Sequence, residues 1–332
     1  MEYPTAPDQT KLSDAANECL VKTYVKEAAT NLYDLTPYFE VLNEVTGYSS
    51  FTEAEYATVL KWCREALDEA ETEKELKIVL GGMIGDASLT WLEKVASELG
   101  SAGSYIDVIS FHYYDGWPDL QTFIDNLKDT LVSTGLDDKP LWLTEAGLTP
   151  GPTPPGSIDE AAELQAHEMF QKFSIAFGNG VELANWHPLV STCDPTDPPD
   201  PECTFGGYGL YQVGTGTATM AWDAYQLFAT TLGNFITCTP VSEGPEIWAY
   251  RYAVPVFSFD SIYRNYWVIW ADGSPTDSLS DIESALGDFD WVNVTSVASG
   301  FGFPRWDLRL ASSVTFGTTP ILIEDSRWHT SP

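Results

Sequence analysis

Strand and helix patterns alternate along the first 233 residues of this chain, and this alternation limits the fold more than any other feature. Five short apolar runs lie at residues 38–42, 76–80, 106–112, 141–145 and 181–186. Amphipathic segments with a period near 3.6 residues lie at residues 12–33, 52–67, 89–99, 120–132, 159–177 and 219–232. Regular alternation of this kind is typical of parallel strands with helices packed outside them. We therefore expect an α/β domain over residues 1–233.

The pattern changes at about residue 234. Short runs rich in β-branched and aromatic residues follow one another there, separated by Gly, Pro, Asp and Ser. They lie at residues 246–252, 265–270, 290–295, 307–310 and 320–323. Strand-like runs without helices between them predict an antiparallel module, and we expect a β-sandwich over residues 234–332.

Polar and aromatic residues gather at the carboxyl ends of four of the predicted parallel strands. They are Asn43, Glu44, His112, Tyr114, Glu145, Trp186 and His187. In a βα barrel the carboxyl ends of the strands converge on the active site. A buried strand that ends in a carboxylate places a costly charge at the edge of a core, and such charges are usually there for chemistry. Glu44 and Glu145 are therefore the first candidates for catalysis.

The chain is strongly acidic, and this limits its partners. It has 49 acidic and 16 basic residues, which give a formal net charge of −33. This charge repels phosphate backbones and anionic lipid surfaces, so neither nucleic acid nor a membrane is expected as a partner. It also disfavours polyanionic substrates, so we expect a neutral one. The sequence has no run of about 18 apolar residues that could span a membrane.

The cysteines give a hint about the compartment. Cys193 and Cys203 bracket a proline-rich loop that a disulfide could close, and a disulfide would indicate secretion into an oxidising environment. We expect Cys19, Cys63 and Cys238 to be buried single cysteines. The sequence has no zinc-like cluster of His and Cys and no phosphate-binding glycine loop, so no metal or cofactor is expected.

Four segments together resemble one enzyme family. In chain order they are Phe39-Glu-Val-Leu-Asn-Glu44, Val108-Ile-Ser-Phe-His-Tyr-Tyr114, Trp142-Leu-Thr-Glu-Ala-Gly147 and Ala184-Asn-Trp186. They resemble strands four, six, seven and eight of retaining glycoside hydrolases with a (β/α)8 barrel, the clan that includes cellulases, mannanases and β-xylosidases. Residues 214–232 and the all-β tail resemble the helix after strand eight and the sandwich appended in several of these families. The resemblance implies a TIM-type barrel that acts on an oligo- or polysaccharide.

The resemblance also implies the catalytic roles. Glu44 would be the acid/base that protonates the glycosidic oxygen, and Glu145 would be the nucleophile that attacks the anomeric carbon. Retaining enzymes hold these two carboxyl groups about 5–5.5 Å apart, in environments that keep one protonated and the other ionised. Asn43 would hydrogen-bond the sugar 2-hydroxyl, an interaction that strengthens in the transition state.

Further strand-end residues would bind the substrate by the same resemblance. His112 or Tyr114 would orient or tune the nucleophile, and the sequence does not decide between them. Trp186 would form the floor of the sugar site. Trp117 and His187 would make outer contacts.

The chain departs from the family in the number of its strands. Only five barrel strands can be counted, whereas the family has three strand-helix units before the Asn-Glu strand. We therefore expect a partial barrel made of strands four to eight. Five strands cannot close a barrel, and they leave parallel edges unpaired. A gene fragment, or a partner chain or second copy that covers the open side, would account for this.

Two functions from different classes stay open. The first is a glycosidase that cleaves the O-glycosidic bonds of a neutral glycan by a retaining double displacement. The second is a non-catalytic, secreted carbohydrate-binding or structural protein derived from such a barrel. A separation between the Glu44 and Glu145 carboxyl groups well beyond about 10 Å would favour the second function, because it exceeds the range of either hydrolytic geometry.

Overall fold

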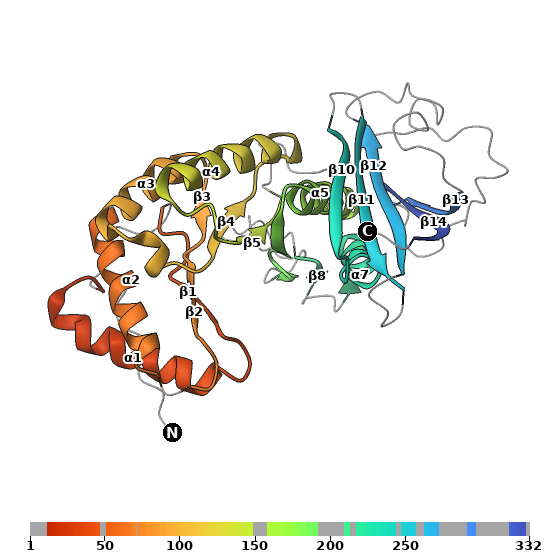
Figure 1. Cartoon of the computed structure of the whole chain (residues 1–332). Helices are drawn as coiled ribbons and strands as arrows, with labels where there is room; N and C mark the ends of the chain where they lie inside the picture. The colour runs from red at the N-terminus through yellow and green to blue at the C-terminus, as the bar shows by residue number, and fades with distance from the viewer. Residues whose placement is uncertain are drawn as a thin grey trace. The chain divides into compact units, whose positions relative to one another are not determined.

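The protein is described from a computed structural model (Figure 1). The structure describes residues 12–46, 51–70, 72–148, 158–191, 209–212, 217–243, 247–256, 262–271, 291–296 and 319–329. Packing divides the chain into two compact units. The first comprises Met1–Tyr113, Thr122–Glu145 and Val181–Asn185, and the second comprises Tyr114–Gln121, Ala146–Gly180 and Trp186–Pro332.

Parallel strands form the centre of the first unit. They are β1 (Tyr38–Val41), β2 (Lys77–Leu80), β3 (Met83–Ile84), β4 (Ile109–Tyr113), β5 (Leu141–Ala146) and β6 (Val181–Trp186). β1 pairs with β2 and β3 pairs with β4, both in parallel. A parallel bridge between Val79 and Val108 connects the two groups, and the order continues from β4 through β5 to β6. The predicted parallel sheet of an α/β fold is therefore present.

Helices lie along one side of these strands (Figure 1). They are α1 (Glu18–Leu32), α2 (Glu53–Asp68), α3 (Ala87–Leu99) and α4 (Leu120–Thr134). The predicted capping pattern at the start of α2 is confirmed, since Thr52 and Glu55 form a reciprocal capping box. A cap of this kind stabilises a helix by about 1 kcal/mol. Tyr56, Leu60 and Cys63 of α2 are buried on one face, as the helical period requires. Short 3-10 turns lie at η2 (Ala15–Asn17) and η3 (Ala102–Ser104), and a third, η4 (Trp117–Asp119), belongs to the second unit.

Strand β5 shows how the sheet separates a core face from a second face. Leu141 and Leu143 are buried, whereas Trp142 and Thr144, which point the opposite way, are half-buried. Leu141 and Leu143 therefore belong to the buried face of the strand, and the other face is the one that can present polar groups.

This second face is concave. The rings of Tyr38 in β1 and Trp142 in β5 have their centroids 4.7 Å apart, although β2 and β4 lie between these strands. In a flat sheet, three strand spacings would separate them by roughly 14 Å. The sheet must curve to bring them into contact, so residues on this face from non-adjacent strands can meet.

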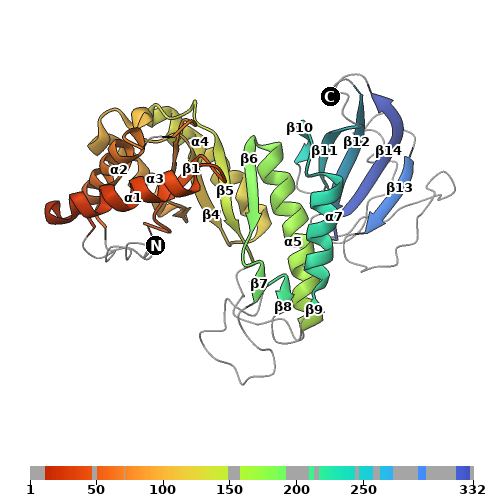
Figure 2. The same ribbon diagram turned by 90° about the horizontal axis from the view of Figure 1, so that it is seen from below.

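The second unit combines helices with an antiparallel sheet. Its elements are α5 (Ile158–Gly178), α7 (Met220–Thr231), β10 (Thr237–Glu243), β11 (Ile247–Pro255), β12 (Tyr263–Ala271), β13 (Trp291–Ser296) and β14 (Ile321–His329), with a small sheet of β7 (Val190–Ser191), β8 (Tyr211–Gln212) and β9 (Thr217–Ala218). The strand order of the large sheet is β10-β11-β12-β14-β13. Figure 2 shows α5 and α7 side by side next to this sheet. The Tyr252 hydroxyl of β11 lies 2.9 Å from Oγ of Ser174 in α5, and its ring packs edge-on against Phe228 of α7.

The described residues after Gly233 form one five-stranded antiparallel sheet, and α5 and α7 supply a layer that packs against it. The β-sandwich predicted over residues 234–332 stays a prediction, since the structure describes only part of this range. The predicted strand at 307–310 lies outside the described residues. The predicted domains 1–233 and 234–332 stay a prediction, since close packing does not show which segments fold on their own.

The prediction that Cys19 is buried is wrong, because this residue is exposed. The buried face of α1 is set by Val21 and Ala29, and Cys19 lies about 200° around the helix from Val21. Cys63 is buried as predicted, and Cys238 is half-buried. The predicted pair Cys193 and Cys203 lies outside the described residues. Among the helices that the structure describes, none combines the length and the apolar character needed to cross a bilayer.

Candidate active site

Glu44 follows β1 in a loop with an uncommon backbone. Leu42 has a φ of 66° and Glu44 a φ of 47°, in the left-handed region that residues with a side chain rarely adopt. Backbone strain of this kind persists where the surrounding structure enforces it, and it is concentrated at functional sites. Glu44 is also buried, with 8% of its surface exposed. The position of the Glu44 side chain therefore comes with two unfavourable features, a strained backbone and a buried carboxyl group.

His112 and Glu145 come from neighbouring strands. His112 lies in β4 and is only 1% exposed, and Glu145 lies near the end of β5 and is half-buried. The carboxyl ends of neighbouring parallel strands lie at the same edge of a sheet. Glu44 follows the carboxyl end of β1, so the three residues come together at this edge.

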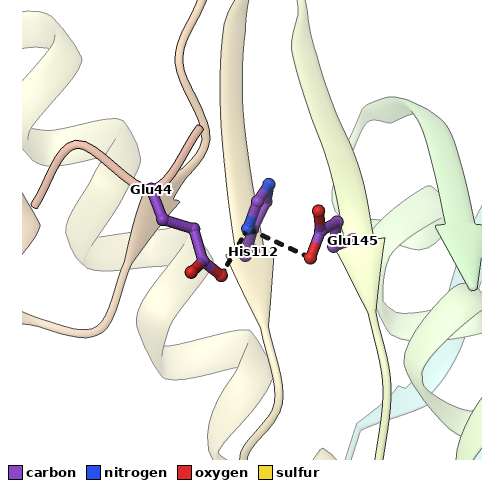
Figure 3. Close-up of side chains that lie close together, drawn as sticks. All are labelled: Glu44, His112 and Glu145. Atoms are coloured by element: carbon purple, nitrogen blue, oxygen red, sulfur yellow. Dashed lines mark hydrogen bonds and ion pairs between the residues drawn. The ribbon is translucent and has the colours of Figure 1, made fainter. Parts of the chain in front are cut away.

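The two carboxylates meet at one imidazole nitrogen (Figure 3). Nδ1 of His112 lies 2.9 Å from Oε1 of Glu44 and 3.4 Å from Oε2 of Glu145. One oxygen of each carboxylate and the nitrogen all lie within 4.8 Å of one another. A protonated Nδ1 has one hydrogen, so it donates to Glu44 at the shorter distance and leaves Glu145 as a second acceptor. The side chain of Glu44 is 10% exposed and that of Glu145 is 22% exposed.

Gly82 makes room for the imidazole. A Cβ added at this position would lie 2.0 Å from Nε2 of His112 and 2.5 Å from Cδ2. Carbon atoms normally approach other heavy atoms no closer than about 3.5 Å, so only glycine fits here. The Gly82 N–H donates to Oε1 of Glu40 at 2.9 Å, which holds this backbone in place.

Glu40 is a third carboxylate beside the site, and the sequence reasoning missed it. It lies in β1, and its Oε1 is 2.9 Å from Oγ of Ser110 and 3.4 Å from Oγ1 of Thr144. The residue is exposed, although its carboxyl group lies against Gly82, Ser110 and Thr144. Partial desolvation raises the pKa of Glu40, and repulsion from Glu145 adds to the effect. Hydrogen bonds from Ser110 and Gly82 and the charge of His112 oppose it only in part. The available signal was the two-residue strand period, which places Glu40 on the same face as Tyr38.

Three further residues, Asn43, Tyr114 and Trp186, were predicted to bind the substrate. Asn43 is exposed in the loop that carries Glu44. Tyr114 and Trp186 belong to the second unit. The Tyr114 hydroxyl lies 2.9 Å from Nδ1 of His187, and Trp186 is buried with Nζ of Lys172 over its ring, 5.8 Å from the centroid. Their roles in substrate binding stay predictions.

Trp117 was expected as an outer substrate contact and is instead a core residue of the second unit. It is 8% exposed, and its ring packs edge-on against Trp248 and Trp270 at centroid distances of 5.3 and 5.5 Å.

A buried ion pair lies at α5 in the second unit. Nζ of Lys172 donates to the Gly147 carbonyl at 2.6 Å and lies 3.1 Å from Oε2 of Glu168. Burial lowers the pKa of Lys172, and the nearby Glu168 opposes this shift. The lysine side chain has no exposed surface, so its charge depends on these partners. Only the spacing of four residues between Glu168 and Lys172 indicates this pair in the sequence.

The Glu44, His112 and Glu145 side chains offer one nitrogen and two oxygen ligand atoms, which could hold a metal ion. This donor set is one that Zn²⁺ accepts. The same atoms can move protons without a metal, because a carboxylic acid, a carboxylate and an imidazole exchange protons over such distances. The absence of a metal cofactor stays a prediction.

Comparison with known proteins assigns part of the chain to a family model. Residues 59–177 match the glycosyl hydrolase catalytic core, a segment that contains His112 and Glu145. No curated protein gives a significant match to the sequence.

Solved structures share the fold at low sequence identity. A family 39 β-xylosidase from Caulobacter crescentus is 15% identical, with a TM-score of 0.52 over 93% of this chain and 72% of that chain. A glucosidase from Croceicoccus marinus is 14% identical, with a TM-score of 0.56 over 94% of this chain and 75% of that chain. A family 86 β-porphyranase from Bacteroides plebeius is 14% identical, with a TM-score of 0.57 over 94% of this chain and 60% of that chain. The family-model match together with this shared α/β fold supports a glycoside hydrolase.

Proposed function

We propose that the protein is a retaining glycosidase that hydrolyses the O-glycosidic bonds of a neutral glycan. The observation that carries the proposal is the meeting of Glu44 and Glu145 at His112, with carboxylate oxygens within 4.8 Å of each other. Retaining enzymes hold their carboxyl groups about 5–5.5 Å apart, whereas inverting enzymes need about 6.5–9.5 Å to admit a water molecule. The short separation supports the retaining reaction.

The proposed reaction takes two displacements. In the first, the Glu145 carboxylate attacks the anomeric carbon while protonated Glu44 gives its proton to the glycosidic oxygen, so the leaving sugar departs as an alcohol. In the second, the Glu44 carboxylate takes a proton from water, and the water oxygen attacks the anomeric carbon and releases Glu145.

In this reaction His112 would orient both carboxylates through Nδ1. Asn43, Tyr114 and Trp186 keep their proposed roles toward the sugar. The acidity of the whole chain supports a substrate without charge, because its field repels anionic polymers.

We also propose that the curved parallel sheet is the part of a TIM-type barrel that comprises strands four to eight. The contact between Tyr38 and Trp142 supports this proposal, because it requires strong curvature. The position of the three site residues at the carboxyl ends of the strands supports it as well, since TIM barrels carry their active sites there.

Glutamate-to-glutamine variants test the proposed catalysis. Glu145→Gln should lose at least about 10³-fold in kcat on a panel of aryl glycosides, because the amide cannot act as the nucleophile. Glu44→Gln should lose more on substrates with poor leaving groups, which depend on protonation, than on activated ones. Glu182→Gln, at an exposed position in β6, is the matched control and should behave like the unmodified protein.

The stereochemistry of the product tests the retaining mechanism. NMR of the first product formed should show the same anomer as the substrate, because two inversions restore the configuration. The opposite anomer would refute the double displacement while leaving hydrolysis intact. Glycan binding without turnover, unchanged in Glu145→Gln, would instead support the non-catalytic carbohydrate-binding function.

A further inference from the structure

The Tyr56 hydroxyl of α2 connects the end of β1 to the segment that follows β2. It donates to the Val41 carbonyl at 3.0 Å and accepts from the Gly81 N–H at 2.8 Å. Val41 is the last residue of β1, and Gly81 directly follows β2. Tyr56 is fully buried, and this burial raises the pKa of its hydroxyl, so the hydroxyl keeps its hydrogen. One donor, one acceptor and one hydroxyl therefore satisfy one another inside the fold.

This hydroxyl takes the place of a hydrogen bond between the two strands. The Lys77 N–H donates to the Pro37 carbonyl at 2.8 Å. Donors recur at every second residue of a strand, so the Gly81 N–H would donate to the Val41 carbonyl further along the same pair of strands. The Tyr56 hydroxyl bridges this last pair instead. The regular pairing of β1 with β2 therefore ends at a point that Tyr56 sets.

A second hydroxyl fixes the chain on the other side of Glu44. Oγ1 of Thr46 accepts a hydrogen bond of 3.1 Å from the Ile84 N–H and lies 3.5 Å from the Ile84 carbonyl oxygen. Thr46 comes two residues after Glu44, and Ile84 lies in β3. The loop that carries Glu44 is thus held before this residue by Tyr56 and after it by Thr46.

Both hydroxyls attach the loop to residues 81–84, and this segment also positions His112. Gly82 is the residue against which the imidazole packs, and Ile84 pairs in register with His112. Glu44 and His112 are therefore placed by the same short segment. Their contact, 2.9 Å between Oε1 of Glu44 and Nδ1 of His112, depends on both attachments.

The loop needs such restraints because its backbone is strained. Leu42 and Glu44 have φ values of 66° and 47°, in the left-handed region. Residues with a side chain keep this conformation only where the surrounding structure enforces it. If either end were released, the loop would relax and carry the Glu44 carboxyl group away from His112.

We propose that Tyr56 and Thr46 are positioning residues for Glu44. Their hydroxyls hold its loop to residues 81–84 and so keep its carboxyl group at His112. The proposal rests on the proposed glycosidase function for its effect on activity. The contacts around the imidazole can be measured without a substrate, so the two proposals can fail separately.

NMR spectra test the positioning without any activity. Tyr56→Phe removes only the hydroxyl, so the resonance of the Gly81 amide hydrogen should move to higher field as it loses its acceptor. The imidazole nitrogen resonances of His112 should also shift, because the contact with Glu44 changes. Tyr252→Phe removes another buried hydroxyl, in the second unit, and should leave these resonances in place. Unchanged His112 resonances in Tyr56→Phe would overturn the proposal.

Leaving groups test the effect on catalysis, because only a poor leaving group needs the proton of Glu44. In Tyr56→Phe and in Thr46→Val, kcat/KM should fall about 10- to 100-fold on a phenyl glycoside and change little on a dinitrophenyl glycoside. Thr46→Ser keeps the hydroxyl and should restore kcat/KM, and Tyr252→Phe should show no dependence on the leaving group. Equal losses on both substrates would overturn the proposal, because they would indicate general damage rather than a displaced acid.

A double-variant cycle with Glu44→Gln separates the acid from the rest of the fold. The amide of Glu44→Gln has no proton to give, so adding Tyr56→Phe or Thr46→Val should cost little further kcat/KM on the phenyl glycoside. Fully additive losses would overturn the proposal, since the hydroxyls would then act independently of Glu44. The two hydroxyls are removed in separate variants, so the cycle can be completed with either one if the other does not fold.

Discussion

Replacement of Gly82 by alanine should displace the His112 imidazole and separate the two carboxylates. The new Cβ would lie 2.0 Å from Nε2 of His112, and normal contact requires about 3.5 Å, so the ring or the Gly82 backbone must move by more than about 1 Å. A shift of this size lengthens the 2.9 Å contact between Nδ1 and Glu44 beyond hydrogen-bond range. Overpacking of this kind typically costs about 1–3 kcal/mol of stability, and misplacement by about 1 Å can cost about 100-fold in kcat.

Two assays measure these effects, and one variant controls for them. Guanidinium unfolding gives the loss of stability, and kcat on an aryl glycoside gives the loss of activity. Gly103→Ala is the matched control, because a Cβ there would meet nothing closer than 3.7 Å. In a His112→Ala background the clash is gone, so Gly82→Ala should then cost little or nothing in stability.

The double variant also provides the refuting result. If Gly82→Ala destabilises the protein equally with and without the His112 ring, the clash with the imidazole is not the cause of the loss. A Gly82→Ala variant that matches Gly103→Ala in both stability and kcat would refute the reasoning entirely.

Three further predictions follow from buried groups and from the ligand atoms of the site. Lys172→Met should lower the free energy of unfolding by about 3–5 kcal/mol, measured by chemical denaturation, because it leaves the Glu168 charge buried and removes the hydrogen bond to the Gly147 carbonyl. The double variant Lys172→Met, Glu168→Gln should recover part of this loss. Burial raises the pKa of Cys63 to about 12, whereas Cys19 is exposed, so at about pH 8 iodoacetamide should label Cys19 well before Cys63. Peptide mass spectrometry measures the labelling of each cysteine, and equal labelling would contradict the burial of Cys63. Dialysis against EDTA should leave kcat unchanged, and an activity lost to the chelator and restored by Zn²⁺ would show that the site needs a metal.

The parallel part of the fold was predictable because each strand is a short apolar run bounded by helices. The structure places all five predicted strands within a few residues of the expected bounds. Strand β10 was not predicted, because Pro240 interrupts a polar segment, and proline is found mainly in edge strands. The structure does place β10 at the edge of its sheet, with a bulge after Pro240.

The candidate site was predictable only in part. Glu44, His112 and Glu145 follow from their positions at strand ends, since parallel strands bring those ends together. Glu40 does not follow, because a single acid within an apolar run gives no sign of its partners, and Thr144 lies 104 residues away. Lys172 was missed for a related reason, because a lysine in an amphipathic helix normally lies on the solvent side.

The packing of α5 and α7 on the antiparallel sheet bears on how this protein can be shortened. A truncated chain that ends near residue 233 would lack the antiparallel sheet that packs against these helices. Aromatic rings such as Phe228 would become exposed, and Ser174 would lose its contact with the Tyr252 hydroxyl. Exposed apolar surface of this kind favours aggregation over soluble expression. A shortened variant for crystallisation should therefore retain the antiparallel sheet together with α5 and α7.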